Sequence, residues 1–455
     1  MSTLNAEQNM AYERFLQGAS IFITGPAGCG KSFLINQIRR YCQEHDVPHG
    51  VTALTGAAAH LIGGQTLHAW GGLGMATEPA STLISKITRR TAVCKRWREC
   101  RVLIIDEVSM MSAELFNKLH LIATGLRSAR AGPAGSGALF GGLQIVLCGD
   151  FAQLEPIGAE KFCFESKLWA SIETFYLPKI IRQADPEFQS ILMQIRLGQV
   201  TPQIKQALNA RLICDEAEAD ITLEDENGNP AGVIKGTMLY PLRRDVDRIN
   251  TDELDKLVSN GAATKEFIAV DNARHRHTGA VVSMTRNYVE VLNKRLTTLE
   301  SLTLAVGAQV MLLKNMDVDS GLVNGSRGVV TGFDGTGHPT IAFDNGEQLH
   351  INPASFEVEV DGLILVRKQI PLMLAWAMTI HKCQGATISH VITDLSDIFG
   401  NAQAYVTLSR VRSLEGLHII GINYRKITCH PKVREYYRKL EASLIDHPPQ
   451  PAEAS

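Results

Sequence analysis

The sequence predicts an α/β protein built on a parallel β-sheet with helices covering both faces. Short apolar runs, such as 102–105 and 144–148, are bounded by glycines or acidic residues. These runs are apolar throughout instead of alternating with polar residues, which is typical of parallel strands buried on both faces. Segments with a helical pattern separate them. The length of 455 residues leaves room for about three domains.

The first part of the chain alternates helices and strands. The pattern predicts a helix at 7–16, a short strand at 20–24, a glycine-rich turn and a second helix at 32–44. Further buried strands are predicted at 47–54, 102–105 and 144–148. Two segments are predicted to be surface loops: 128–142, which is rich in Gly, Ala and Ser, and 215–226, which carries seven acidic residues and no basic one.

The pattern changes between about residues 300 and 370. Short apolar strands are separated there by the pairs Asn324-Gly325, Asn345-Gly346 and Asp361-Gly362, which are hairpin turn signals. We therefore expect a small antiparallel barrel inserted into the α/β chain. Strand–helix alternation returns after Pro371 and ends with a basic helix at 432–440. A second α/β domain of similar design, beginning near Thr237, remains possible, and we expect a disordered tail that includes 448–455.

Composition and charge exclude several classes of protein. Hydrophobic residues make up 45% and charged residues 20%, so global disorder is excluded. The 45 basic and 47 acidic residues give a net charge of −2, which excludes binding to nucleic acid by bulk charge but allows a local basic groove. One candidate is 86–101, with seven basic residues and one Glu, although such runs are usually solvated faces. No apolar run approaches the length of a membrane span, about 20 residues.

Cysteine usage and the N-terminal sequence indicate a soluble intracellular protein. The nine cysteines are scattered and include no CxxC, so disulfide scaffolds and zinc ribbons are not expected. The first twenty residues contain acidic and polar groups and lack the apolar core of a signal peptide.

A phosphate-binding loop is predicted between the strand at 20–24 and the helix at 32–44. Its residues are Gly25-Pro26-Ala27-Gly28-Cys29-Gly30-Lys31-Ser32, which match G-x-x-x-x-G-K-[ST]. Glycines allow consecutive backbone N–H groups to point at a phosphate, and the helix N-terminus adds partial positive charge. Lys31 can bridge the β- and γ-phosphates, and the Ser32 hydroxyl can bind Mg²⁺. The sequence therefore predicts a nucleoside triphosphate site.

Polar side chains follow two more of the predicted strands. Asp106 and Glu107 come at the end of the strand at 102–105, where open α/β sheets build their sites. Asp106 is predicted to hold Mg²⁺, and Glu107 to act as general base for the attacking water, which favours ATP hydrolysis over nucleotide storage. Gln153 follows the strand at 144–148 and is a candidate sensor of the γ-phosphate.

Further segments resemble helicase motifs. Residues 150–156, Asp-Phe-Ala-Gln-Leu-Glu-Pro, resemble motif III; 379–385, Thr-Ile-His-Lys-Cys-Gln-Gly, resemble motif V; and 404–412, Ala-Tyr-Val-Thr-Leu-Ser-Arg-Val-Arg, resemble motif VI of superfamily-one helicases. With 176–185, 306–315 and 324–328, they make the chain similar to the Pif family of 5′→3′ DNA helicases (superfamily one, type B). The likeness runs from about residue 3 to about 422 in the family's order.

The resemblance implies two RecA-like domains, 1A and 2A, that hold ATP between them, with a small 1B insertion and an SH3-like 2B insertion. Domain 1A is expected over 1–71 and 101–185 and domain 1B over 72–100. Domain 2A is expected over 186–300 and 371–440, domain 2B over 301–370, and the disordered tail over 441–455. The basic run then becomes a candidate DNA-facing element of 1B. The short chain is expected to lack the targeting and partner-binding arms of a long N-terminal extension.

The resemblance also implies residue roles at the nucleotide. Gln8 matches the glutamine that recognises adenine. Arg182 and Arg410 match the two arginines that reach the γ-phosphate from the second domain's side, and Gln384 is expected to contact nucleotide. The sequence does not decide whether Tyr405 packs near the base or fills the core. The expected cofactors are ATP and Mg²⁺.

For DNA, the resemblance implies contacts to the phosphates of a single strand. The residues matched are Thr55, Gly56 and His68 in motif Ia and Thr379 and His381 in motif V, although His381 could equally be structural. Phe151 is a candidate stacking platform, as are Trp70 and Trp376, although each more often fills a core. This chain has Glu155-Pro156 where the family usually has two prolines in the motif III tail, and an acid near a DNA phosphate would be repulsive.

The expected function is ATP-dependent 5′→3′ unwinding of duplex or structured DNA in replication, repair and recombination. Expected partners are single-stranded DNA and its junctions with duplex, with G-quadruplex DNA as a further candidate, and we expect a monomeric active form and no membrane. The alternatives are a RecD-like or Dda-like motor, a nucleotide-gated DNA-binding module without unwinding, and an RNA-directed motor.

Overall fold

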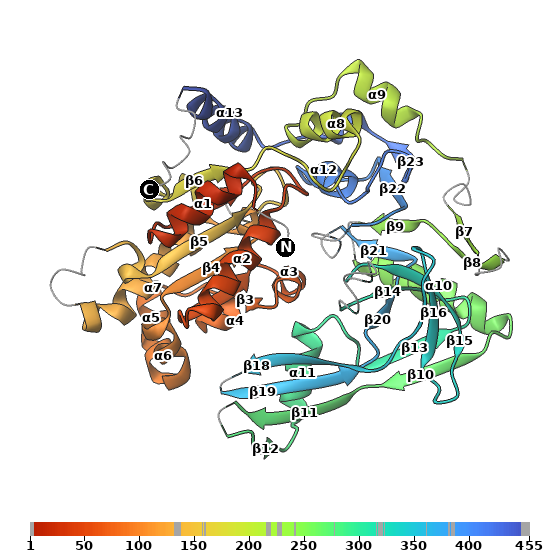
Figure 1. Cartoon of the computed structure of the whole chain (residues 1–455), viewed down its shortest axis with the longest axis horizontal. Helices are drawn as coiled ribbons and strands as arrows, with labels where there is room; N and C mark the ends of the chain where they lie inside the picture. The colour runs from red at the N-terminus through yellow and green to blue at the C-terminus, as the bar shows by residue number, and fades with distance from the viewer. Residues whose placement is uncertain are drawn as a thin grey trace.

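The computed structural model describes residues 4–131, 138–156, 158, 161–214, 220–224, 230–240, 243–276, 278–314, 316, 322, 324–360, 362–380, 383 and 387–446. It shows two α/β lobes and a large antiparallel region next to the second lobe (Figure 1). Within these residues, no helix combines the length and the apolar character that crossing a bilayer would need.

The first lobe contains a six-stranded parallel sheet in the order β3-β2-β4-β5-β1-β6. Its strands are β1 (Ile21–Thr24), β2 (His49–Ala53), β3 (Gln65–Thr66), β4 (Val102–Asp106), β5 (Gln144–Gly149) and β6 (Glu173–Tyr176). Its helices are α1 (Ala6–Leu16), α2 (Lys31–Glu44), α3 (Gly56–Leu61), α4 (Leu67–Gly71), α5 (Ala80–Arg89), α6 (Thr91–Glu99) and α7 (Ala113–Ala131).

Alternate residues of the central strands pack into two different hydrophobic cores, one on each face of the sheet. In β1, Ile21 and Ile23 pack with α1 and α2, whereas Phe22 packs with the core under α5, α6 and α7. In β4, Ile104 faces the first of these cores and Ile105 the second. The apolar runs are therefore strands buried on both faces, as predicted.

The second lobe contains a four-stranded parallel sheet in the order β21-β9-β22-β23. Its strands are β9 (Thr237–Tyr240), β21 (Ala377–Thr379), β22 (Val391–Leu395) and β23 (Leu417–Ile422), and its helices include α8 (Pro186–Arg196), α9 (Pro202–Asn209), α10 (Arg243–Ser259) and α12 (Gln403–Leu408). The second α/β domain that the sequence left possible is therefore present, and it begins near Thr237 as expected. Its core also includes Ala27 and Leu154 of the first lobe, so the two lobes pack directly against each other.

The antiparallel region is formed by sheets β10-β13, β12-β11-β19-β18 and β17-β16-β15-β14-β20. Its strands are β10 (Thr264–Ile268), β11 (Val270–His275), β12 (Val281–Val282), β13 (Ser301–Ala305), β14 (Gln309–Leu312), β15 (Arg327–Phe333), β16 (Pro339–Phe343), β17 (Gln348–His350), β18 (Ala354–Val360), β19 (Leu363–Gln369) and β20 (Leu372–Leu374); α11 (Arg286–Arg295) lies among them. Gly346 (φ 88°) and Gly362 (φ 83°) occupy predicted hairpin turns. The antiparallel strands begin at Thr264, before the expected boundary at 301. The sequence did not indicate β10 and β11 because they carry charged residues and, of their residues, bury only Ala273.

Three local expectations differ from the structure. Helix α7 continues to Ala131 into the segment expected to be a loop, and β7 (Ile221–Glu224), paired with β8 (Pro230–Ile234), lies inside the acidic segment. Helix α13 (Pro431–Asp446) continues beyond 440, so 441–446 is helical and not a disordered tail. Residues 447–455 lie outside the described part of the chain.

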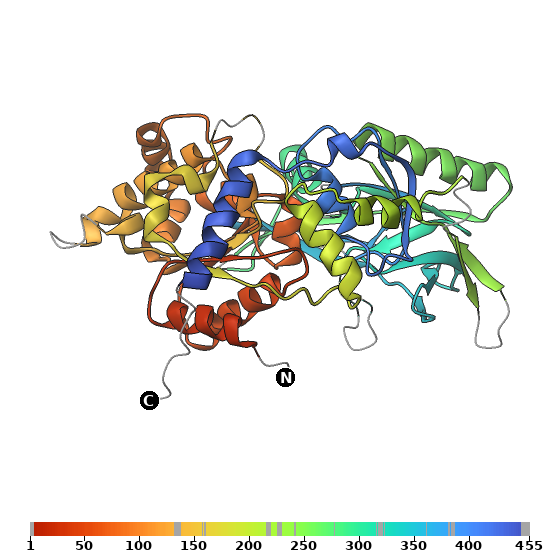
Figure 2. The same ribbon diagram turned by 90° about the horizontal axis from the view of Figure 1, so that it is seen from above.

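Helix α13 also packs on the first lobe, although 371–440 was expected to belong to the second (Figure 2). The physical reason is its apolar stripe, in which Val433 and Tyr437 are one turn apart and are buried in the core that also contains Phe116 and Trp97. The chain thus returns to its first lobe after completing the second.

Candidate active site

The predicted phosphate loop connects β1 to α2 and adopts the backbone that its glycines permit. Gly25, Gly28 and Gly30 have φ of 151°, 77° and 90°, and Gly30 is the N-cap of α2. A side chain at Gly28 would meet Cβ of Arg182 at 2.5 Å, so a glycine is needed there for close approach as well as for conformation. The Lys31 ammonium donates to the carbonyl oxygens of Gly25 and Pro26, at 2.8 Å each.

The predicted acidic pair lies at the carboxyl end of β4. Asp106 is 7% exposed, and its carboxylate accepts the backbone N–H of Glu107 at 2.8 Å. Burial raises the pKa of both carboxyls; for Glu107 the neighbouring Asp106 adds to this effect, while Lys31 and Arg410 oppose it. Two neighbouring carboxylates, one buried and one half-buried, in which ionisation is disfavoured make a fitting environment for a cation.

The donor set suits magnesium better than a transition metal. In the described part of the chain, no cluster of three or more His, Cys, Asp and Glu side chains could hold a metal ion. Mg²⁺ is usually held by one or two carboxylates, waters and the phosphates of its nucleotide. Asp106 with the Ser32 hydroxyl at the start of α2 offers that kind of set.

The Gln153 side chain is presented by a turn that follows β5. Asp150 organises this turn: its carbonyl oxygen accepts the Gln153 N–H at 2.8 Å, and its carboxylate accepts the Ala152 N–H at 3.1 Å. Because β5 lies between β1 and β4 in the sheet, this turn lies between the phosphate loop and the acidic pair.

The two predicted arginines come from segments that pack on the phosphate loop. Arg182 lies in the segment between the lobes; its backbone N–H donates to Gly28 O at 3.2 Å, and its guanidinium donates to Ser409 O at 3.0 Å. Burial, followed by the charge of Arg410, lowers the pKa of Arg182 to about 9, so it remains charged at neutral pH. Arg410, 1% exposed, donates to Val406 O and to the Ser409 hydroxyl of its own segment.

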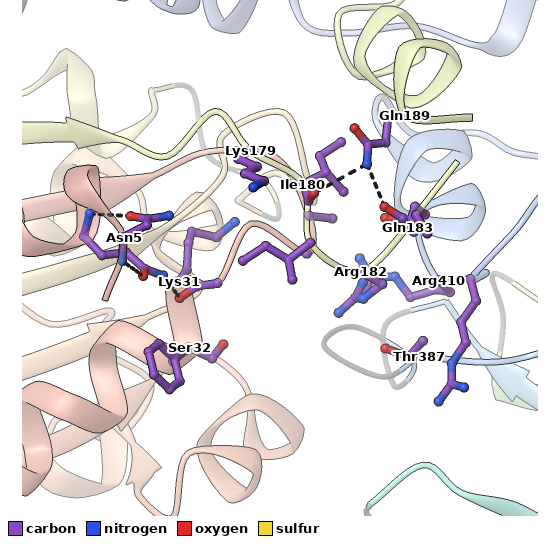
Figure 3. A pocket seen from close by; sticks show the side chains of 18 of the residues that line it. Asn5, Lys31, Ser32, Lys179, Ile180, Arg182, Gln183, Gln189, Thr387 and Arg410 are labelled. Carbon is purple, nitrogen blue, oxygen red and sulfur yellow. Dashed lines mark hydrogen bonds between the residues drawn. The ribbon is translucent and has the colours of Figure 1, made fainter. Parts of the chain in front are cut away.

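One cleft of about 1010 Å³ joins these groups. Figure 3 shows Lys31 and Ser32 on one side of it and Arg182, Gln183 and Arg410 on the other. Of the predicted residues, those that line it are Gln8, Ala27, Gly28, Gly30, Lys31, Ser32, Glu107, Gln153, Arg182 and Arg410. Gly25, Pro26, Cys29 and Asp106 are not among its lining residues, and Gln384 lies outside the described residues.

Gln8 and Tyr405 both contact the phosphate loop. The amide of Gln8 donates to Gly30 O at 3.2 Å, and its oxygen accepts the Asn5 N–H, so the side chain is held at the cleft. Tyr405, which the sequence left open, is buried, and its hydroxyl accepts the Ala27 N–H at 2.7 Å. It therefore makes a direct hydrogen bond between α12 and the phosphate loop, a role that no sequence motif indicates.

A second groove, of about 650 Å³, lies between the first lobe and the antiparallel region. Gly56 and Thr66 line it, together with the basic residues Lys95, Arg96, Arg276 and Arg295 and the acidic residues Glu99 and Glu357. The basic run 86–101 is therefore used in two ways: part of α6 faces this groove, whereas Lys86 pairs with Glu78 on the surface.

The other predicted DNA contacts vary in exposure. Thr55 and His68 are half-buried and do not line the groove. The Thr55 hydroxyl accepts the Ala58 N–H, and burial lowers the pKa of His68, which favours its neutral form. Thr379 is buried at the end of β21. His381 lies outside the described residues.

The prediction that aromatic side chains stack on DNA bases needs correction. Phe151 is 1% exposed and packs its ring against Phe22, Phe164, Trp169 and Tyr436. Trp70 and Trp376 are also buried. Phe151 and Trp376, which follow β5 and β20, fill cores and offer no face to a base in this structure. Trp70 of α4 packs on Trp97 and is 3% exposed, although it lies among the residues that line the second groove.

Comparison with known proteins places this arrangement in a family. The family model described as PIF1-like helicase matches residues 3–206, and that described as DNA helicase Pif1, 2B domain, matches 287–333. Over 96% of its length the chain is 34% identical to the ATP-dependent DNA helicase Pif1 of Bdellovibrio bacteriovorus, and it covers 92% of that protein. The chain belongs to the Pif1 helicase family.

Other Pif1 proteins agree. The chain is 37% identical over 96% of its length to the human ATP-dependent DNA helicase PIF1, but spans 64% of that relative's length. A crystal structure of Pif1 from Bacteroides sp in complex with ADP-AlF4 superposes with a TM-score of 0.76 at 25% identity, covering 97% of this chain and 98% of that one. The predicted Pif1 fold, with RecA-like domains and a 2B domain, is therefore confirmed. The match to the 2B model begins in α11, again before residue 301.

Proposed function

We propose that this member of the Pif1 family is an ATP-dependent DNA helicase that moves 5′→3′ along single-stranded DNA and separates duplex or folded DNA. The observation that supports this most is the cleft in which the phosphate loop and Glu107 of the first lobe meet Arg182 and Arg410. ATP bound there would touch both lobes, so its hydrolysis would change how the lobes are held together.

The proposed chemistry uses residues at the cleft. The phosphate-loop amides and the N-terminus of α2 bind the phosphates, and Lys31 bridges their oxygens. Magnesium, when bound by Ser32 and Asp106, supplies charge neutralisation. Glu107 takes the proton of the attacking water while Gln153 contacts the γ-phosphate or that water.

Arg182 and Arg410 complete the site only when the lobes are together. A guanidinium brought to the transferring phosphoryl group neutralises charge that develops in the transition state. Because Arg182 is already bonded to Gly28 and Ser409, a change at the phosphates is transmitted directly to α12 and the second lobe.

We propose that single-stranded DNA crosses the second groove. Its four basic side chains come from both sides, Lys95 and Arg96 from α6 and Arg276 and Arg295 from the antiparallel region. Contacts to phosphates suit a motor, because translocation needs a repeating partner and not a particular base sequence. Alternating grip by the two lobes would advance one nucleotide per ATP, with the duplex split against 1B or 2B.

The biological setting we propose is genome maintenance: replication, repair and recombination. The proposed partners are single-stranded DNA and its junctions with duplex, with G-quadruplex DNA as a further substrate, and the active form is a monomer. The human and Bdellovibrio relatives are ATP-dependent DNA helicases, which supports DNA over RNA.

A paired assay tests the proposal. Steady-state ATP hydrolysis is measured with magnesium alone, with single-stranded DNA and with RNA, and unwinding is measured on forks with a 5′ or a 3′ tail. We expect DNA-stimulated hydrolysis and unwinding from the 5′ tail only. Lys31→Ala should abolish both while retaining salt-sensitive DNA binding. Stimulation without unwinding would instead identify a nucleotide-gated binding module.

A further inference from the structure

A buried polar cluster lies beneath the nucleotide cleft, and of its members only Asp150 has been given a role above. We define the Tyr437 cluster as Tyr437 of α13, Asp150 after β5 and Arg196 of α8. All three residues are 0% exposed. The cluster joins three elements that are far apart in the sequence, and Figures 1 and 2 both show α13 lying against the first lobe.

The Tyr437 hydroxyl makes three hydrogen bonds. It donates to the Asp150 carboxylate at 2.8 Å and accepts the Phe151 N–H at 3.0 Å. The Thr24 hydroxyl lies 2.8 Å away and must be the donor, because the single phenol proton is already used on Asp150. Tyr437 therefore holds the last residue of β1, directly before the phosphate loop, and the first residues of the turn that carries Gln153.

Arg196 fixes the same carboxylate from the other side. Its Nε and Nη2 donate to the two Asp150 oxygens at 3.0 and 2.8 Å, and its guanidinium lies 4.0 Å from the centre of the Tyr437 ring. Burial acts to raise the pKa of Asp150, but the Arg196 charge and hydrogen bonds outweigh it and lower that pKa. An ionised carboxylate held at both oxygens is a rigid support.

This support reaches the cleft through one short turn. The Asp150 carboxylate accepts the Ala152 N–H and its carbonyl oxygen accepts the Gln153 N–H, so its position sets the path of the backbone into Gln153. Gln153 in turn lines the nucleotide cleft. A buried charge pair is weak evidence for a stabilising role, because its desolvation cost offsets its attraction. A role in orienting Gln153 accounts for a fully satisfied carboxylate at this place.

We propose that Tyr437 is a positioning residue for ATP hydrolysis, through which the C-terminal helix holds the Gln153 turn and the entry to the phosphate loop in register. The proposal rests on the ATP hydrolysis proposed above. Nucleotide binding itself is made by the phosphate-loop amides, Lys31 and the start of α2, none of which contacts Tyr437. The expected signature is thus a change in kcat with nucleotide affinity retained.

The test is Tyr437→Phe in the full chain, which keeps the ring and removes the hydroxyl. We expect kcat for DNA-stimulated ATP hydrolysis to fall about tenfold, less than the roughly 10²-fold that a 1 Å misplacement of a catalytic group can cost. The affinity for ADP and for single-stranded DNA should stay within about twofold. All assays are run where circular dichroism shows the variants to be folded. Thr24→Val, which removes only one of the three hydrogen bonds, should give a smaller fall in kcat.

Two controls separate positioning from stability. Tyr436→Phe alters the neighbouring residue of α13, whose ring packs on Phe151 and Phe164, and should leave kcat within about twofold of the parent. In a Gln153→Ala background, Tyr437→Phe should have no further effect on kcat.

Three outcomes would overturn the proposal: a parental kcat in Tyr437→Phe, an equal decrease in Tyr436→Phe, or a full further decrease in the Gln153→Ala background. If the parent chain itself fails to hydrolyse ATP, the proposed function fails and not the cluster's role. An active parent with an unaffected Tyr437→Phe variant rejects only the inference.

Discussion

At the scale of residues, the cleft is held together by backbone carbonyls and amides as much as by side-chain pairs. Arg182 donates to Ser409 O, Lys31 donates to Gly25 O and Pro26 O, and Tyr405 accepts from Ala27. The bonds of Arg182 and Lys31 keep these two cations near the place where the phosphates would bind. Phosphate oxygens, being charged acceptors, are stronger partners than carbonyls.

Glu107→Gln should separate binding from hydrolysis. Glutamine keeps the shape of the side chain but cannot accept the proton of the attacking water, so we expect DNA-stimulated ATP hydrolysis to fall by roughly 10²- to 10⁴-fold. ATP affinity, measured by equilibrium binding of a fluorescent analogue, should be retained. Glu114→Gln, on the exposed side of α7, is the matched control and should hydrolyse ATP normally. Comparable rates in the two variants would exclude Glu107 as the base.

Arg182→Ala and Arg410→Ala should each reduce kcat by about 10³-fold, the size of effect that arginines supplied to a transferring phosphoryl group usually have. Arg425→Ala, an exposed arginine after β23, provides the control. Rates are measured at saturating ATP and DNA. If Arg182→Ala retained DNA-stimulated hydrolysis, the arginine that reaches the phosphates across the cleft would have to lie elsewhere.

At the scale of elements, helix α7 supports the strands that carry the acidic pair and Gln153. Phe116 on its inner face is 0% exposed and meets the rings of Phe140 and Trp169. Leu121 on the same helix is 52% exposed. The same helix therefore offers a buried and an exposed apolar residue for comparison.

Phe116→Ala should destabilise the first lobe by about 3–5 kcal/mol, because it leaves a cavity among aromatic rings. Leu121→Ala should change the stability by less than about 0.5 kcal/mol. Urea unfolding followed by tryptophan fluorescence reports on the lobe, since Trp97 and Trp169 lie in its core. Equal midpoints for the two variants would contradict the assigned core.

At the scale of the whole molecule, the chain crosses between its lobes twice: through the segment that carries Arg182, and through the segment that leads back to α13. The first crossing lines the nucleotide cleft and bonds to Gly28, whereas the second leads to Tyr437, which bonds to Thr24 directly before the phosphate loop. The basic groove, by contrast, lies between the first lobe and the antiparallel region. Nucleotide and DNA are thus expected at two separate junctions of the first lobe, one with the second lobe and one with the antiparallel region.

The groove predicts a specific salt dependence. Arg276→Ala should weaken single-stranded DNA binding and reduce the slope of log affinity against log salt by about 0.7, because one phosphate fewer is neutralised by the protein. Arg243→Ala is the control: this exposed arginine pairs with Asp247 on its own helix α10, and neither residue lines the groove, so its slope should equal the parent's. Binding is measured by fluorescence anisotropy over a salt series. Identical slopes for both variants would place the DNA elsewhere.

The sequence by itself determined the elements that carry the chemistry. Backbone and spacing requirements at Gly25–Ser32 and at the strand end of Asp106 are local, so the motif, its strand and its helix could be predicted together. The apolar runs also predicted the buried parallel strands correctly. One sequence signal was not used. Arg196 lies on the same buried face of α8 as Leu192 and Ile195, and a charged residue on a buried face needs a partner of opposite charge.

Tertiary structure alone decided which distant residues meet. Nothing local shows that Tyr405 contacts Ala27, that Tyr437 reaches Thr24, or that α13 returns to the first lobe, because these contacts join positions hundreds of residues apart. It also decided that Phe151 fills a core, since an aromatic residue after a strand can equally face solvent or other rings. Short-range backbone preference fixes elements, whereas burial of apolar surface and pairing of buried polar groups fix their partners.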